Sequence, residues 1–206
     1  SHAGISVGPD GATHQMLEDI ALMRVLPNMV VIAPGDSLEA DRATRALAED
    51  KRPAYLRLAR EATPIITTEE TPFTIGKAYL YREGTDITLM TTGTMTYQAL
   101  VAADKLAKDN ISVEVLHIPT IKPLDTVAVL ASARKTKRVI TVEEAQIVGG
   151  LGGAISEFLS EEAPTHVHRM GIKDRFGESG KPDELLEHFG LTAKHIVLQV
   201  HRIMTS

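Results

Sequence analysis

Two histidines and an aspartate stand within the first fifteen residues, at His2, Asp10 and His14. Three glycines and a proline separate them, so we expect neither a helix nor a strand to run between them. Loops held by a rigid scaffold commonly carry chemistry. Two imidazoles and a carboxylate on one loop could relay protons, orient a hydroxylated substrate or bind a metal ion. The alternative from the residues alone is a surface turn at Asp10, with His14 capping the helix that follows.

Two arginines follow further along the chain, in the segment Tyr-Leu-Arg-Leu-Ala-Arg. Arg57 lies within a predicted strand over residues 54–59, whereas Arg60 comes at its end. In open α/β sheets ligands gather at the carboxyl ends of strands, where an arginine can bind a phosphate through two parallel N–H groups. Position therefore favours Arg60 over Arg57 as a phosphate ligand. The alternative is a pair of exposed arginines, with Arg60 ion-paired to Glu61.

A glycine run, Gly149–Gly153, follows a predicted strand and opens a predicted helix. The glycines are not in register with a G-x-G-x-x-G motif, and no P-loop lysine follows them. The pattern favours close packing of the helix on the sheet over phosphate binding. Glu143 and Glu144, at the end of the preceding strand, could line a cleft or an interface. The other six histidines lack the spacing of a metal-binding helix and are assigned to structural roles: His117, His166, His168, His188, His195 and His201.

Composition excludes several classes of function. Acidic residues outnumber basic ones by 27 to 22, the net charge is −5, and no run of Lys or Arg occurs. The sequence therefore predicts no nucleic-acid partner. With no cysteine, the chain has no disulfide and no thiolate site. No apolar run approaches the roughly 20 residues needed to span a bilayer, and no signal peptide opens the chain. We expect a cytoplasmic protein without a membrane partner.

Hydrophobic periodicity predicts strands that alternate with helices, which is typical of mostly parallel, helix-covered sheets in an α/β fold. In the first third we expect a helix, a strand, a helix and a strand, at 14–26, 29–33, 38–49 and 54–59. Further strands are expected at 77–81, 87–92, 112–117, 138–143 and 166–171. Further helices are expected at 96–109, 124–133, 150–161, 182–188 and 193–203.

A change of composition divides the chain. Residues 62–73 are rich in Thr, Glu and Pro and show little periodicity, which is typical of a linker. We predict a partial domain over 1–66, a linker over 67–73 and a complete three-layer α/β domain over 74–206. The first of these reads as the back half of a larger domain, whose front half we expect to precede residue 1.

The whole chain resembles the transketolases, especially the type encoded as separate N- and C-terminal halves. The resemblance implies that residues 1–66 are the end of the pyrimidine-binding domain and residues 74–206 the C-terminal domain. The matching segments occur in the expected order: His14-Gln15, Pro27-Asn28, Tyr55–Arg60, Thr120–Asp125, Val142–Glu144, Gly149–Gly153, Phe176–Gly180, Leu185-Leu186 and Gly190–Thr192.

The resemblance also implies roles for four residues in transferring a two-carbon ketol unit between sugar phosphates. His2 resembles the histidine that helps hold the substrate phosphate and sugar, and Arg60 the arginine that grips the phosphate. Asp10 resembles the aspartate that recognises the donor's C2 hydroxyl, and His14 the histidine near the reacting carbonyl. Asp10 and His14 are thus expected to be catalytic, and all four residues are expected to bind substrate.

The family uses thiamine diphosphate and Mg²⁺, but its activating glutamate, the aromatic residues stacked on the cofactor and the diphosphate site are not found in this chain. We expect the chain alone to bind neither cofactor and to be inactive. Its expected partners are the N-terminal transketolase part or subunit and a second copy in a homodimer.

Three alternatives stay open. A 1-deoxyxylulose-5-phosphate synthase shares the architecture, but His14-Gln15 and the context of Arg60 favour a transketolase. A 2-oxoacid dehydrogenase β subunit fits the opening loop badly. An assembly or dimerisation module without catalysis is the third.

Overall fold

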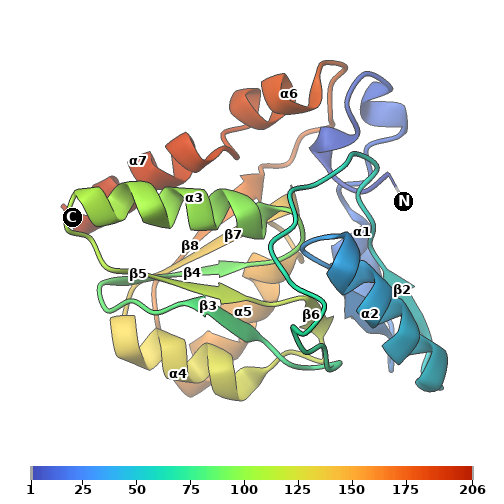
Figure 1. Cartoon of the computed structure of the whole chain (residues 1–206), viewed down its shortest axis with the longest axis horizontal. Coiled ribbons are helices and arrows are strands. Elements are labelled where there is room, and N and C mark those ends of the chain that lie inside the picture. The colour runs from blue at the N-terminus through green and yellow to red at the C-terminus, as the bar shows by residue number, and fades with distance from the viewer. Residues whose placement is uncertain (1, 206) are drawn as a thin grey trace.

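The structure, a computed structural model, describes residues 2–205 as two sheets with helices packed around them (Figure 1). The larger sheet has five strands in the order β3-β5-β4-β7-β8, and the smaller has three in the order β2-β1-β6. The expected α/β fold is confirmed. The strands of the larger sheet are β3 (Tyr79–Arg82), β4 (Ile87–Thr91), β5 (Val113–His117), β7 (Val139–Gln146) and β8 (Val167–Ile172).

Helices cover both faces of the larger sheet, so the expected three-layer arrangement is confirmed (Figure 1). Strand β4 shows the reason, because Ile87 and Leu89 pack in one core cluster and Met90 in the other. Strands buried on both faces read as continuous apolar runs. One layer contains α3 (Met95–Lys108), α6 (Pro182–His188) and α7 (Ala193–Met204), and the other contains α4 (Thr126–Thr136) and α5 (Leu151–Glu162). Within residues 2–205, no helix has the length and apolar character needed to cross a bilayer.

The smaller sheet combines two strands from the earlier part of the chain with one from the later part. Its buried central strand β1 (Val30–Ile32) pairs in parallel with β2 (Ala54–Leu56) and antiparallel with β6 (Thr120–Lys122). Sequence analysis did not predict β6, because three residues before a proline carry no readable periodicity. The later part of the chain therefore supplies a strand to the sheet of the earlier part. Helices α1 (Asp19–Val25) and α2 (Ser37–Glu49) pack beside this sheet (Figure 1).

The first helix is shorter than expected. A helix over 14–26 was predicted, but α1 begins only at Asp19. Residue Met16 forms a bridge with Ala3 instead, and its N–H donates to the carbonyl of His2. This long-range pairing holds residues before α1 extended, although their apolar spacing suits a helix. The opening loop also contains two three-residue 3₁₀ turns, Ile5–Val7 and Gly11–Thr13, where no helix was expected.

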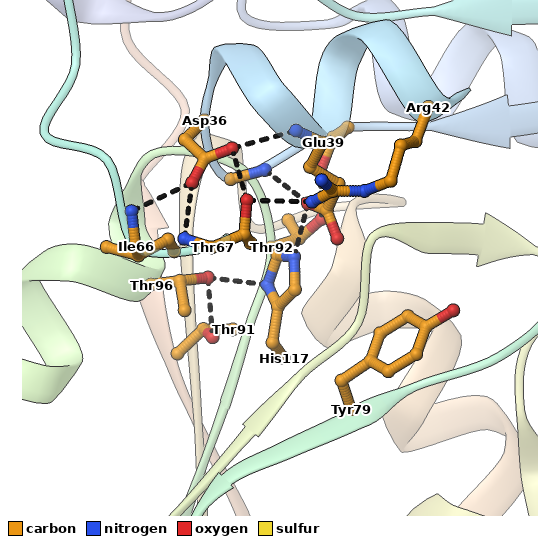
Figure 2. A network of polar contacts seen from close by, with 12 residues as sticks. Asp36, Glu39, Arg42, Ile66, Thr67, Tyr79, Thr91, Thr92, Thr96 and His117 are labelled. Atoms are coloured by element: carbon orange, nitrogen blue, oxygen red, sulfur yellow. Dashed lines mark hydrogen bonds and ion pairs between the residues drawn. The ribbon is translucent and has the colours of Figure 1, made fainter. Parts of the chain in front are cut away.

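The segment 62–73 contains no helix or strand, yet it is tied down through Asp36 (Figure 2). The Asp36 carboxylate caps α2 by accepting from the N–H of Glu39, and it also accepts from the N–H groups of Ile66 and Thr67. Burial pushes the pKa of Asp36 upward, but these hydrogen bonds outweigh it and lower the pKa below its ordinary value.

A buried pair next to Asp36 joins α2 to the larger sheet (Figure 2). Glu39 Oε2 lies 2.8 Å from Nε2 of His117, at the carboxyl end of β5, and both side chains are fully buried. His117 Nδ1 lies 2.7 Å from the Thr96 hydroxyl on α3. His117 is therefore a structural residue that fixes the earlier part of the chain against the carboxyl ends of β4 and β5.

Candidate functional site

The four predicted site residues form two pairs, one within the opening loop and one between the loop and Arg60. The rings of His2 and His14 lie 6.0 Å apart between centroids, tilted by 55°. The carboxylate of Asp10 forms an ion pair with the guanidinium of Arg60. A single 3₁₀ turn connects Asp10 to His14, so the pairs share one short segment. His2 adopts a φ of 70°, and strained non-glycine backbone of this kind clusters at functional sites.

The two pairs are open to solvent. The side chain of Asp10 is 36% exposed and that of Arg60 is 39% exposed, so a ligand can reach both. His14 is exposed, and its Nδ1 lies 2.9 Å from the hydroxyl of Thr13. Nε2 is therefore the ring nitrogen that a ligand could use. The two pairs together contain two imidazoles, a carboxylate and a guanidinium. Their chemistry suits a molecule with several hydroxyl groups and an anionic group.

Arg57 connects the residues that follow the opening loop to the end of β7. Its guanidinium donates to Asp19 at 2.8 Å and to the carbonyl oxygens of Met16 and Glu144 at 3.1 and 2.9 Å. Arg57 and Asp19 are both buried, and Asp19 also accepts a hydrogen bond from the Tyr55 hydroxyl. Burial, followed by the charge of Asp19, raises the pKa of Tyr55 to about 12. Arg57 is therefore a structural residue, whereas Arg60 reaches the surface.

Gln15 ties the loop to the later part of the chain, a role that sequence analysis missed. Its amide nitrogen lies within 3.3 Å of the carbonyl oxygens of Ile5, Gly8 and Glu178. A Cβ on Gly177 would lie 1.6 Å from Gln15 Oε1, so a larger residue there would displace the Gln15 amide. The only sequence signal for this contact was the His14-Gln15 pair within the family resemblance.

Glu144 supports the same loop from the end of β7. Its carboxylate accepts from the N–H of Ser6 at 2.5 Å and from the hydroxyl of Thr94 at 2.9 Å. A Cβ on Gly4 would lie 2.4 Å from Glu144 Oε1, which explains the glycine there. Glu144 thus lies at an interface, but one between two parts of this chain.

The carboxylate of Glu143, a residue of β7, lies at the start of α5, where the glycine run had raised the question of phosphate binding. It accepts from the N–H groups of Leu151 and Gly152, the donors that a phosphate would need. A Cβ on Gly152 would lie 2.6 Å from Thr141 Oγ1, so the glycines allow close packing of α5 on the sheet, as expected. Burial raises the pKa of Glu143 to about 7, against the lowering effect of the two N–H groups.

The raised pKa of Glu143 predicts a pH-dependent stability. The ordinary pKa of 4.5 applies in the unfolded chain, so the folded state binds the proton more tightly. Stability from this group is complete below pH 4.5 and is lost as the pH rises through 7, by about 3 kcal/mol in total. Urea unfolding between pH 5 and 8 should show this loss for the natural chain but not for Glu143→Gln. Exposed Glu161 provides the control, because Glu161→Gln should keep the pH profile; parallel profiles for all three proteins would contradict the prediction.

One cavity borders the opening loop. It has a volume of about 350 Å³ and lies between residues 12–18 and the pair Phe176 and Gly177. Another, of about 430 Å³, contains no residue of the loop and is lined by residues that include Arg57, Glu61 and Thr94. A larger cavity, of about 760 Å³, lies elsewhere, between β8 and α7.

Thiamine diphosphate would need groups that bind a diphosphate and its Mg²⁺. Within residues 2–205, no group of three or more His, Asp or Glu side chains could hold a metal ion on its own. The N–H groups at the start of α5, the one glycine-rich helix start, are already bound to Glu143. The loop with Asp10 and Arg60 offers groups for a substrate.

Comparison with known domains decides the family. Residues 1–65 match the transketolase pyrimidine binding domain, and residues 76–196 match the transketolase C-terminal domain. The chain belongs to the transketolase family. Transketolases depend on thiamine diphosphate, and the expected resemblance is confirmed.

Individual transketolases agree with this assignment. A 6-deoxy-6-sulfo-D-fructose transketolase subunit of Clostridium sp. is 45% identical over 203 residues, covering 98% of this chain. Transketolase-like protein 1 of Bos taurus is 38% identical over 207 residues, covering 99% of this chain. The chain spans 63% of the first protein and 35% of the second. A solved split-gene transketolase, described as an inactive β4 tetramer, is 41% identical with a TM-score of 0.92; the match covers 99% of this chain and 65% of that one.

Proposed function

We propose that this chain is the C-terminal part of a transketolase that transfers a two-carbon ketol unit between sugar phosphates. The arrangement that carries the proposal is the Asp10–Arg60 ion pair together with the His2–His14 pair, which one short turn between Asp10 and His14 connects. The thiamine diphosphate and Mg²⁺ belong to an N-terminal partner polypeptide, and two copies of each chain complete the enzyme. The relatives of which this chain spans only part support such a partner. Without the partner the chain is inactive.

The Asp10–Arg60 pair gives the site a way to respond to its substrate. A phosphate dianion binds a guanidinium through two charge-assisted hydrogen bonds and competes with the Asp10 carboxylate for Arg60. Once released, Asp10 can accept a hydrogen bond from a substrate hydroxyl. His14 presents Nε2 to a second hydroxyl or to the carbonyl, since its Nδ1 is bound to Thr13. The protein thereby orients a phosphorylated sugar, while the cofactor of the complete enzyme supplies the carbanion chemistry.

The experiment combines the chain with an N-terminal transketolase polypeptide, thiamine diphosphate and Mg²⁺, and measures ketol transfer. Arg60→Gln should raise KM for a phosphorylated substrate by about tenfold or more, because a charged hydrogen bond is lost. It should have little effect on an unphosphorylated ketose. Asp10→Asn should lower kcat/KM about tenfold for both substrates, since it weakens the bond to a hydroxyl.

The matched control is Arg45→Gln. Arg45 is an exposed, ion-paired arginine like Arg60 but lies on α2, so its replacement should leave KM and kcat/KM unchanged. Equal losses with and without the substrate phosphate would refute the role of Arg60. Ketol transfer by the chain without its partner would refute the division of labour. An assembly that binds the partner but never gains activity would favour the non-catalytic module.

A further inference from the structure

The cavity of about 760 Å³ lies between β8, the edge strand of the larger sheet, and α7. Its volume falls within the range of small-molecule sites. It shares no lining residue with the cavity that borders the opening loop or with the cavity beside Arg57. In Figure 1, α7 runs to the C-terminus, at the opposite end of the molecule from the N-terminal segment. The cavity is therefore separate from the proposed ketol-transfer site.

Its charged and protonatable lining is entirely basic. No Asp or Glu lines the cavity, although acidic residues predominate in the chain as a whole. Charges of one sign on a concave surface focus the potential and attract counter-ions. The basic lining residues are His166, His168, Arg169, Lys173, His195 and Arg202.

Two of these cations have no carboxylate partner. Among the ion pairs formed by residues 2–205, none includes Lys173 or Arg202. The rings of His166 and His168 stack at 4.1 Å between centroids. Burial lowers the pKa of His168, and the nearby His166 and Arg202 lower it further. The lowered pKa favours the neutral form of His168, and His195 lies 3.7 Å from a carboxylate oxygen of Glu187. The uncompensated charge of the cavity therefore belongs to Lys173 and Arg202, and a bound anion would pair with it.

The remaining wall is apolar. Met170, Phe189, Leu198 and Ile203 line the cavity together with the basic groups. Leu198 is 57% exposed, so a bound ligand can contact it. A ligand that matches this lining has an anionic group and an organic part large enough to cover the apolar wall.

We propose that this cavity binds a small organic phosphate. Arg202 and Lys173 bind the phosphate oxygens, because guanidinium and ammonium groups form charge-assisted hydrogen bonds with them. Leu198 and Phe189 contact the organic part. The ligand is a small molecule, since the cations line one open cavity and do not form the extended stripe that nucleic acid requires.

Calorimetric titration of the full chain tests this site with three probes: adenosine monophosphate, glycerol 3-phosphate and inorganic phosphate. We expect saturable binding of the organic phosphates, with adenosine monophosphate binding more tightly than inorganic phosphate. Arg202→Gln should weaken binding about tenfold, because it removes a hydrogen bond between charged groups. Lys173→Gln should also weaken binding. It serves as a second test of the site if the Arg202→Gln variant does not fold.

Arg134→Gln is the matched control, since Arg134 is also an exposed arginine in the last turn of a helix and should leave binding unchanged. Arg60→Gln separates this site from the ketol-transfer site and should likewise retain binding. The proposal is overturned if no probe saturates, if both Arg202→Gln and Lys173→Gln bind as the natural chain does, or if Arg60→Gln alone abolishes binding.

Discussion

Replacing Arg57 with methionine is expected to lower the free energy of unfolding by about 3–5 kcal/mol, the usual cost of breaking a buried ion pair. Arg57 is 8% exposed and Asp19 is 3% exposed, so the change leaves a buried carboxylate without its cation. The carbonyl oxygens of Met16 and Glu144 lose a donor in the same step. Chemical denaturation measures the loss, and the opening loop should become sensitive to limited proteolysis.

Three further variants separate the buried charge from lost packing. Tyr55→Phe removes only one hydrogen bond to Asp19 and should cost about 1 kcal/mol. Arg45→Met removes a fully exposed ion pair and should leave the unfolding midpoint unchanged. Arg57→Met combined with Asp19→Leu should recover part of the lost stability, because no unpaired charge remains. A double variant no more stable than Arg57→Met would rule out the unpaired Asp19 charge as the cause.

Replacing His117 with leucine should have an effect of similar size, about 3–5 kcal/mol. Glu39 would keep the N–H of Gly35 as a donor but lose its imidazole partner in a fully buried site. The Thr96 hydroxyl would lose a partner as well. Because this pair joins α2 to β5, unfolding of the earlier part of the chain should separate from unfolding of the larger sheet.

A double-mutant cycle with Glu39→Leu tests the pairing directly. We expect a coupling energy of about 1–3 kcal/mol between the two substitutions. His201→Leu is the matched control, since its pairing with Asp109 lies at the surface, and this change should leave stability nearly unchanged. Strict additivity of His117→Leu and Glu39→Leu would show that the buried contact contributes nothing beyond the two separate side chains.

At Arg57 and His117 the sequence was sufficient to predict a structural role and not a ligand-binding one. Arg57 was set aside as a ligand because a strand was predicted over residues 54–59. The strand β2 ends at Leu56, so that reason was wrong, yet the structure still buries Arg57. His117 was assigned to a structural role, and the structure pairs it with Glu39 inside the molecule. The sequence could not name their partners, Asp19 and Glu39, because 38 residues separate the first pair and 78 the second.

Where sequence reasoning failed, long-range pairing overrode the local pattern. The apolar spacing over residues 14–26 suits a helix, yet Met16 pairs with Ala3 and α1 starts at Asp19. The strand β6 is stable only because β1 lies beside it. Tertiary hydrogen bonds outweigh local propensity in segments this short.

The sequence by itself determined the α/β architecture, the transketolase resemblance and a loop that carries His2, Asp10 and His14. Those features depend on neighbours along the chain, because periodicity and glycine spacing act over a few residues. Only the tertiary structure decided that Asp10 pairs with Arg60, that Gln15 reaches Glu178 across 163 residues, and that basic side chains of β8 and α7 line one cavity. Polar contacts of this kind depend on how distant segments pack, and no local pattern in the chain specifies their partners.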